Sequence, residues 1–404
     1  MRMTVKAIHE EGRPAWGAIW ALALMTLAMT TAQNLPVSLL TPIAADLRIT
    51  EGVAGQSMTV PAASALVTSL VIAVLSQRIN RRTLLLGLAL LLGVSNALVA
   101  AAPSLPVLLF GRLLMGVSMG AFWPLAPALI MRLVPAQDVS RGLSIAFAGV
   151  AVSTIASAPL ASYLGAIVGW RAVFWGAAGL AALALVWQFA ALPSLPSHSQ
   201  ARFATLFRLL KRPPVFLGLF AAILFFSGHS AFFTYVRPYL ESVTRLGVTE
   251  LSGILLAFGV AGFVGTSASG PMLKWSLSLT IAGMCGLMSL MAVGLTFFGR
   301  LPILVTVLLA FWGFGSSVVP VAWNVWLTRV FTEETESGGG LFVATAQLAL
   351  MTGSAAGGAM VDSQGPIGAV VLAGSLLLVG AILIITTMRS DEADRVIVAE
   401  PASA

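Results

Sequence analysis

Charged residues are scarce in this chain. Asp, Glu, Lys and Arg make up 9% of its 404 residues, whereas about a quarter is usual for a soluble protein. Hydrophobic residues make up 58%, and the mean hydropathy is +0.97. A chain of this composition cannot cover a water-facing surface, so a soluble protein is excluded and a membrane protein with many spans is predicted.

Cysteine and histidine are also nearly absent. The single cysteine, Cys285, lies in an apolar run, so no internal disulfide can form and thiols cannot build a metal site. Two of the three histidines, His9 and His198, lie in polar segments, and no cluster of acids, histidines and nucleophiles marks a catalytic centre. The glycines at 338–340 are not followed by Lys and Ser or Thr, so no phosphate-binding loop is present. We therefore predict no enzyme activity, metal or cofactor, and no use of bound ATP.

Acidic residues are missing from the interior of the long apolar runs. All 15 of them lie in tails, in loops or at the ends of these runs. Polar groups inside a bilayer are costly, so those that are kept there usually face a cavity or a partner. The polar residues within the runs are therefore the candidate functional residues, and no deep carboxylate is among them.

Long apolar runs are what the chain has in abundance. A spanning helix needs about 20 mostly apolar residues, and twelve runs meet this length. They cover residues 16–42, 53–76, 83–103, 106–131, 142–166, 172–192, 214–238, 250–273, 277–298, 302–328, 338–361 and 367–388. The longest polar stretch separates the sixth run from the seventh, which divides the chain into a half at 1–192, a linker at 193–213 and a half at 214–404.

The distribution of basic residues predicts the orientation in the membrane. Most of the 22 Lys and Arg residues fall in alternate loops, on the side that holds both chain ends. Because cytoplasmic loops carry the excess of Lys and Arg, both termini are predicted to be cytoplasmic. The net charge of +7 then needs no nucleic-acid polymer as a partner. The linker segment RFATLFRLLKR could be a basic amphipathic helix on the membrane surface or a solvated connection.

Three short motifs resemble those of a known transporter family. They are LSQRINRR at 75–82, FGRLLMGVSMG at 110–120, and ASAPLASYLG with GWRAVF at 156–174. They resemble the loop 2–3, helix 4 and helix 5 motifs of the major facilitator superfamily, in its branch of twelve-helix drug and sugar exporters. The first motif is incomplete, because Gln77 and Asn80 stand where the family has Asp and Gly. The residues that the resemblance implies in coupling or gating are Arg78, Arg81, Arg82, Arg112 and Pro159.

The resemblance implies an all-α membrane protein with twelve transmembrane helices in two six-helix halves, the major facilitator fold. It implies a monomeric secondary transporter, in a bacterial inner membrane, that exports a small-molecule substrate by alternating access coupled to protons. Five further stretches, LPVSLLTPIAADL, EGVAGQSMTV, MRLVP, AFFTYVRP and VPVAWNVWLTR, resemble bacterial exporters of purine ribonucleosides. The expected substrate is therefore of the inosine or guanosine type.

Two alternatives within transport stay open, an exporter of drugs or sugars and an uncoupled facilitator. A membrane enzyme or a receptor on a similar scaffold is disfavoured. The chain shows no catalytic cluster, and the tail after Met388 is too short for a soluble output domain.

Gln33 and Asn34 stand inside the first apolar run, just before Leu35 and Pro36. Proton-driven relatives have an acid at the position of Gln33, and an amide cannot carry a proton. We expect Gln33 to hydrogen-bond the substrate, with an amide bond between helices as the alternative. Asn34 points about 100° away and is more consistent with a packing role, although it belongs to the candidate substrate-binding set.

His229 and Arg112 are the titratable and cationic residues deep in the runs. His229 reaches a depth in the seventh run similar to that of Gln33 in the first, and its unperturbed pKa of about 6.5 suits proton transfer. Substrate binding and proton coupling are its two expected roles. For Arg112 the alternatives are coupling and hydrogen bonding to backbone carbonyls near a helix kink. Arg237 is expected at the membrane interface, paired with Glu241 one turn on.

Aromatic rings and amides complete the predicted binding site. Flat rings stack on a base, and Asn or Gln can read its edge. Each ring taken singly could instead face lipid or pack in the core. The remaining candidate substrate-binding residues are Trp123, Phe233, Trp323, Asn324 and Gln347.

Overall fold

The structure, a computed structural model, describes residues 15–75, 79–195, 213–330 and 335–398. Within these ranges, twelve helical stretches are long and apolar enough to cross a membrane, which confirms the predicted number. The first half contains α2 (Trp16–Leu47), α3 (Glu51–Ala54), α4 (Gln56–Leu75), α5 (Arg81–Ala100), α6 (Leu105–Leu133), the 3₁₀ turn η1 (Ala136–Asp138), α7 (Val139–Val168) and α8 (Trp170–Ala191). The second half contains α10 (Pro213–Phe233), α11 (Val236–Ser242), α12 (Val248–Trp275), α13 (Leu277–Phe298), α14 (Pro302–Val330), α15 (Thr335–Gln364) and α16 (Pro366–Val398).

Helix ends differ from the predicted runs in two places. Helix α2 continues beyond the predicted end at residue 42 to Leu47, and α16 continues to Val398. An apolar run marks where a helix lies in the membrane, but the backbone hydrogen bonds of the helix can continue into polar sequence. The proposed surface helix in the linker lies outside the described residues.

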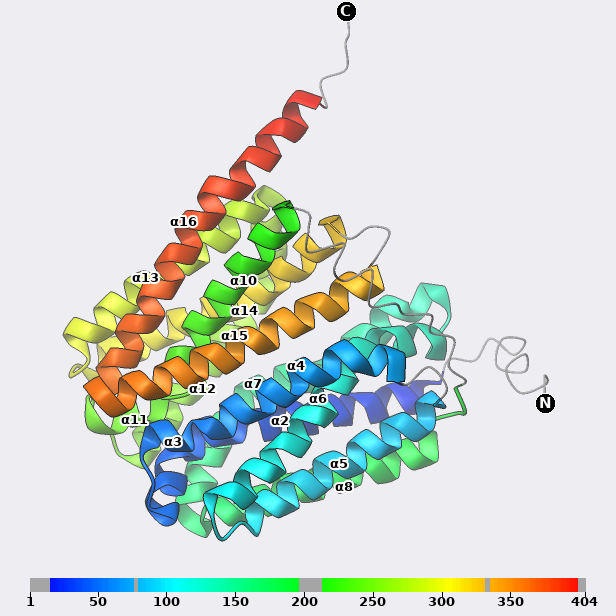
Figure 1. The fold of residues 1–404 in the computed structure, drawn as a ribbon, viewed down its shortest axis with the longest axis horizontal. Coiled ribbons are helices and arrows are strands. Elements are labelled where there is room, and N and C mark those ends of the chain that lie inside the picture. The colour runs from blue at the N-terminus through cyan, green and yellow to red at the C-terminus, as the bar shows by residue number, and fades with distance from the viewer. Residues whose placement is uncertain (1–14, 76–78, 196–212, 331–334, 399–404) are drawn as a thin grey trace, which may run out of the picture.

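The two halves have the same internal packing. In the first half α2 packs on α7, α4 on α6, and α5 on α8. The helices that hold the same places in the second half repeat this pattern, because α10 packs on α15, α12 on α14, and α13 on α16. Figure 1 shows the halves as two layers, the first coloured blue to green and the second green to red. Each half is therefore a packed unit with its own core.

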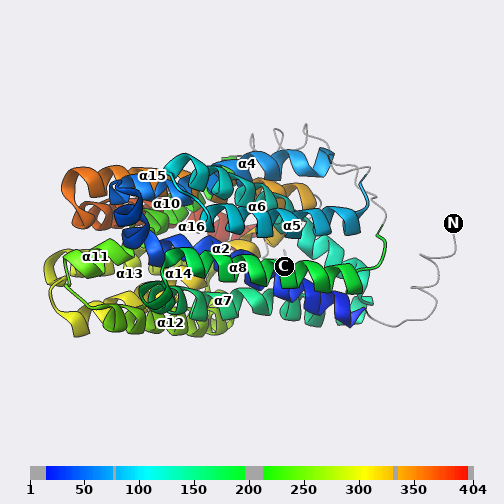
Figure 2. The ribbon, with the colours of Figure 1, turned by 90° about the horizontal axis from the view of Figure 1, so that it is seen from below.

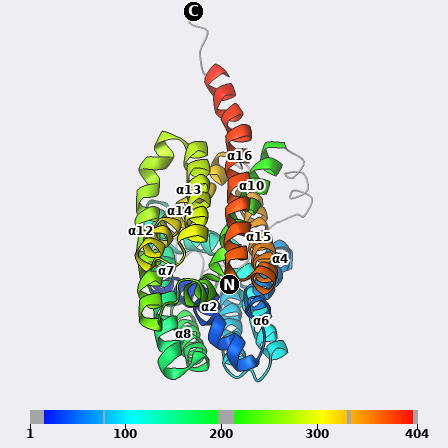
Figure 3. The ribbon, with the colours of Figure 1, turned by 90° about the vertical axis from the view of Figure 1, so that its left-hand side faces the viewer.

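The halves meet along two seams. Helix α4 lies against α15, and α7 lies against α12, and both pairs lie side by side in Figures 2 and 3. These are again equivalent pairs, since the second and fifth spans of one half contact the fifth and second spans of the other. The site that a transporter of this layout uses lies between the halves, so the two seams frame it.

Hydrogen bonds tie the seams together at the end of the bundle that holds the turn between α2 and α3, which we call the distal end. Asp362, in the last turn of α15, accepts from the Gly52 backbone N–H at 3.0 Å and from Thr50 Oγ1 at 2.9 Å. It thus caps the N-terminus of α3 from the other half. The backbones approach closely here, since a Cβ added to Gly52 would lie 2.5 Å from the Gly358 carbonyl oxygen.

We predict that Asp362→Ala loosens the distal end, because both hydrogen bonds to the first half are lost. The measurement is the distance distribution between spin labels at Ala45→Cys and Ser363→Cys, two exposed positions, in a Cys285→Ser background without other cysteines. Glu250→Ala is the matched control, because Glu250 caps α12 within its own half through the Gly247 N–H. Longer distances are expected for the first variant alone, and an equal change in both would show that Asp362 does not join the halves.

Candidate functional site

Arg112 lies in α6, fully buried, and binds backbone carbonyls. Its Nε donates to the Ser57 carbonyl and its Nη1 to the Ala32 carbonyl, both at 2.8 Å. Each of these carbonyls lies four residues before a proline, Pro61 in α4 and Pro36 in α2. Because proline has no N–H, the carbonyl four residues earlier loses its helical partner. Arg112 therefore supplies the donors that both prolines remove.

This arrangement decides between the two roles considered for Arg112. Its fourth contact is Nη2 with the Gln33 carbonyl at 3.5 Å, and no carboxylate of the described residues hydrogen-bonds to it. The guanidinium has five N–H donors in a fixed plane, so it can serve two helices at once. The structure therefore shows the alternative given from the sequence, hydrogen bonding to carbonyls near a kink.

Arg237 repeats this solution between the halves. It lies in α11 and donates to the carbonyl of Ser38, four residues before Pro42 in α2. It also pairs with Glu241 at 2.7 Å, as predicted. The expected interfacial position is wrong, because the Arg237 side chain is only 7% exposed. The free carbonyl of α2 draws it inward, toward the first half.

Gln33 and Asn34 lie in α2 beside the carbonyls that Arg112 binds. Both residues are half-buried, and neither side chain hydrogen-bonds to another described residue. The packing bond expected of Asn34 is thus not formed within the described chain. Gln33 lies 17 residues into α2 and His229 lies 16 residues into α10, which at 1.5 Å per residue is roughly 26 Å and roughly 24 Å along equivalent helices. The two residues are placed at similar depth.

His229 is the centre of a row of aromatic rings. Phe225 and Phe233 lie one turn on either side of it in α10, and the Phe233 ring is nearly parallel to the imidazole with centroids 5.0 Å apart. Phe233 also stacks on Phe258 of α12 at 5.0 Å. The indole Nε1 of Trp312, in α14, donates to His229 Nδ1 at 3.2 Å. Three helices of the second half therefore hold the imidazole.

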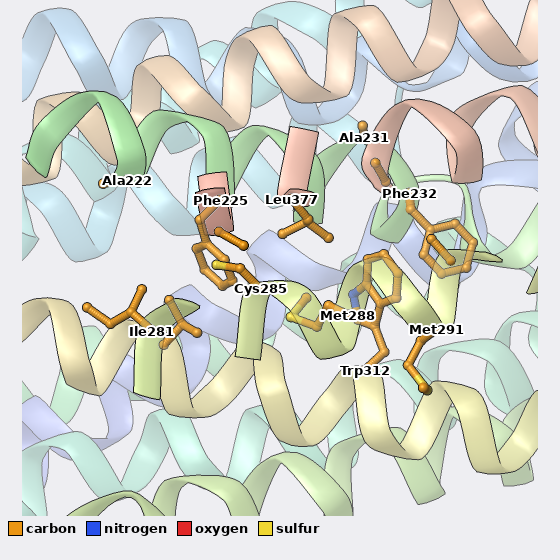
Figure 4. Packing of buried hydrophobic residues seen from close by; sticks show 14 of the residues in the cluster. Ala222, Phe225, Ala231, Phe232, Ile281, Cys285, Met288, Met291, Trp312 and Leu377 are labelled. Atoms are coloured by element: carbon orange, nitrogen blue, oxygen red, sulfur yellow. The ribbon is translucent and has the colours of Figure 1, made fainter. Parts of the chain in front are cut away.

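The sequence analysis missed Trp312. It lies in an apolar run with other aromatic residues, and no local pattern distinguishes it from a core tryptophan. It is fully buried and packs edge to face on Phe232 with centroids 4.9 Å apart. Figure 4 shows its indole within the core of the second half, with Met288 and Phe232 beside it. Only the fold brings it to His229.

Trp323 and Gln347 keep unpaired polar atoms in the core of the second half. Trp323 is fully buried with its Nε1 unpaired, and Gln347 is 5% exposed with its Oε1 unpaired, among the described residues. The Trp323 ring packs edge to face on Trp326 at 5.3 Å. Asn324, the neighbour of Trp323, is exposed, and its Nδ2 donates to the Pro320 carbonyl of its own helix at 2.8 Å. The predicted cluster on α14 is thus split between the core and the surface.

Trp123 and Pro159 lie in the first half. Trp123 is half-buried on α6, stacked on Phe147 of α7 with centroids 5.9 Å apart and planes 7° apart. Pro159 is half-buried in α7, one turn after Ile155. At Ile155 the seam is so close that a Cβ on Gly259 of α12 would lie 2.8 Å from the Ile155 Cα. Pro159 therefore lies next to a contact between the halves, whereas Trp123 packs within one half.

The loop arginines bind within the first half. The Arg82 Nη2 donates to the Phe189 carbonyl at 2.7 Å, and the guanidinium lies 5.4 Å from the Phe189 ring centroid. The Arg81 side chain is buried, and its backbone N–H donates to the Leu195 carbonyl at 2.9 Å. These contacts join the start of α5 to the end of α8. Arg78 lies outside the described residues.

We predict that Arg112→Met lowers the melting temperature of the detergent-purified protein. Two buried carbonyls are left unpaired, at a cost of about 1–3 kcal/mol each. Adding Pro36→Ala and Pro61→Ala restores the helical N–H donors, so Arg112→Met should cost clearly less in that background. An equal cost in both backgrounds would show that Arg112 does not act through these carbonyls. Arg171→Met is the control, because its pair with Asp46 is exposed and worth little.

Comparison with known proteins follows the geometry. Residues 22–342 match the family model of the Major Facilitator Superfamily. The chain is 43% identical over 397 residues to a protein of Pseudomonas aeruginosa named transcription regulatory protein OpdE, covering 96% of this chain and 99% of that one. It is 41% identical over 377 residues to the purine ribonucleoside efflux pump NepI of Salmonella paratyphi B, covering 93% and 95%.

Solved structures share the fold at low sequence identity. A POT family transporter in complex with 5-aminolevulinic acid superposes with a TM-score of 0.74 at 15% identity, covering 93% of this chain and 96% of that chain. A D-xylose–proton symporter superposes with a TM-score of 0.69 at 18% identity, covering 92% and 96%. The twelve spans, the repeated packing of the halves and the family match lead to one conclusion: the chain is a transporter of the major facilitator superfamily.

Proposed function

We propose that the protein exports purine ribonucleosides across a bacterial inner membrane by alternating access, with both termini in the cytoplasm. The relatives named as purine ribonucleoside efflux pumps, at 41% identity over nearly the whole chain, support this substrate class. The distribution of basic residues supports the orientation. The distal end then faces outward.

The observation that carries the proposal is the pair of unpaired polar atoms beside aromatic rings in the second half. The Trp323 Nε1 is a donor and the Gln347 Oε1 is an acceptor, and both are buried without a partner among the described residues. A buried polar group without a partner costs about 1–3 kcal/mol. Native proteins keep such groups where a water or a ligand pairs with them. A solute that supplies an acceptor and a donor fits both atoms.

The surrounding groups fit a nucleobase. Aromatic side chains stack on the face of a base, and amides pair with its edge. The second half supplies the row of Phe225, His229 and Phe233, and the first half supplies the free amide of Gln33 at a similar depth. We therefore assign the base to the second half, with Gln33 reaching the substrate from the first.

Alternating access requires the two halves to separate at each end in turn. Asp362 and Arg237 tie the halves at the distal end. With the proposed orientation, this conformation is closed to the outside and takes substrate from the cytoplasm. Proton antiport is part of the proposal, and Asp362 could serve it, because protonation of its carboxylate would weaken the two hydrogen bonds that it accepts from the first half.

We predict that purified protein in proteoliposomes catalyses counterflow of labelled inosine. Trp323→Phe keeps the ring and removes the N–H, and Gln347→Leu removes the acceptor, so each should raise KM by several-fold to about tenfold, as for the loss of one buried hydrogen bond. Trp187→Phe is the matched control, because Trp187 is 41% exposed in α8.

Absence of inosine counterflow, with transport of a drug or a sugar from a panel, would overturn the substrate class. An imposed pH gradient tests the coupling. Uptake against a concentration difference is expected for an antiporter, and wild-type indifference to the gradient would make the protein a facilitator.

A further inference from the structure

The hydrogen bond between Trp312 and His229 fixes where the imidazole can carry its proton. The indole N–H is a donor only, so the nitrogen that faces it must offer a lone pair. That nitrogen is Nδ1, at 3.2 Å. A neutral imidazole with an unprotonated Nδ1 carries its hydrogen on Nε2. His229 therefore has one tautomer in this arrangement.

The two rings have little freedom to leave this geometry. Trp312 is fully buried and packs edge to face on Phe232, at a centroid distance of 4.9 Å. The imidazole lies between the rings of Phe225 and Phe233, with interplanar angles of 8° and 18°. Rotation of His229 about its ring bond would disturb both stacks. Trp312 thus selects the tautomer, and the phenylalanines hold the ring plane.

The second nitrogen remains available. His229 is half-buried, and its Nε2 makes no hydrogen bond to a described residue. None of the titratable side chains of the described second half bonds to the imidazole. The Tyr235 hydroxyl donates to the Ser354 carbonyl, and the Tyr239 hydroxyl donates to the Leu295 carbonyl. The others are the buried thiol of α13 and charged groups near helix ends, namely Cys285, Arg237, Glu241, Arg245, Glu250, Lys274, Arg300 and Asp362.

We propose that Trp312 is a positioning residue that makes His229 a fixed N–H donor to the transported solute. The inference deepens the proposed function, on which it rests for the solute. His229 Nε2–H would recognise a hydrogen-bond acceptor such as a carbonyl oxygen or a ring nitrogen, and both kinds are present on the edge of a purine base.

The same bond sets His229 apart from a proton carrier. Protonation of Nδ1 would place two N–H donors against each other and break the bond to Trp312. His229 then stays neutral through the transport cycle for as long as Trp312 holds it. This replaces the coupling role expected from the sequence with a recognition role.

Nitrogen NMR tests the tautomer directly. The chain has three histidines, so His9→Gln and His198→Gln leave His229 as the single signal in ¹⁵N-histidine-labelled protein. Nδ1 is expected to be unprotonated and Nε2 protonated, without change from about pH 5.5 to about pH 8, across the range in which a free histidine titrates. A protonated Nδ1, or ordinary titration, would overturn the proposal without any change to Trp312.

The variant Trp312→Phe should release the imidazole. Both tautomers are then expected, with titration of His229 and a pH-dependent inosine counterflow that is absent from the wild type. The double variant Trp312→Phe with His229→Gln should lose this pH dependence. An unchanged pH profile in properly folded Trp312→Phe would assign Trp312 to packing alone.

Solute contact has its own measurement. Saturating inosine should shift the Nε2 signal and leave the Nδ1 signal in place, and no shift with a transported solute would show that His229 does not touch it. Gln at position 229 keeps an N–H donor and Leu does not, so His229→Gln should retain about tenfold more transport, as for one buried hydrogen bond. A fixed tautomer together with absent inosine counterflow would overturn the proposed substrate and leave the role of Trp312 standing.

Discussion

The contact between Arg112 and the carbonyls of Ala32 and Ser57 is the interaction on which the first half depends. Two prolines interrupt the hydrogen bonding of two neighbouring spans, in a medium with no water to replace the lost donors. One guanidinium restores both. It thereby fixes the positions of α2 and α4 around α6, and it places the bend of α2 so that Gln33 keeps a free amide beside it.

Arg237 solves the same problem with the opposite consequence for motion. Arg112 and its carbonyls belong to one half, so they move together when the halves rock. Arg237 belongs to the second half and the Ser38 carbonyl to the first, so this bond must break whenever the distal end opens. Proline-freed carbonyls therefore serve as a permanent joint in one place and as a reversible contact in the other.

Hydropathy predicts the spans because the bilayer imposes one length on each of them. The prolines and the two arginines are equally visible in the sequence, and Arg112 could be related to carbonyls near a kink. What the sequence does not contain is the pairing across helices. Arg237 reads as interfacial until α2 is placed beside it, and Trp312 has no distinguishing neighbour until α14 packs near α10. Trp323 and Asn324 are adjacent in sequence, yet successive residues of a helix face different sides, so one is buried and the other is exposed.

The repeated fold gives this difference a functional meaning. The fourth span of the first half, α6, sends an N–H donor to the first span, α2, and the equivalent α14 sends one to α10. The donor is a charged guanidinium bound to backbone in one half and a neutral indole bound to a side chain in the other. Backbone carbonyls are present whatever the sequence, so the first contact constrains architecture. The second contact sets the chemistry of His229, so the same position in the fold becomes a determinant of recognition.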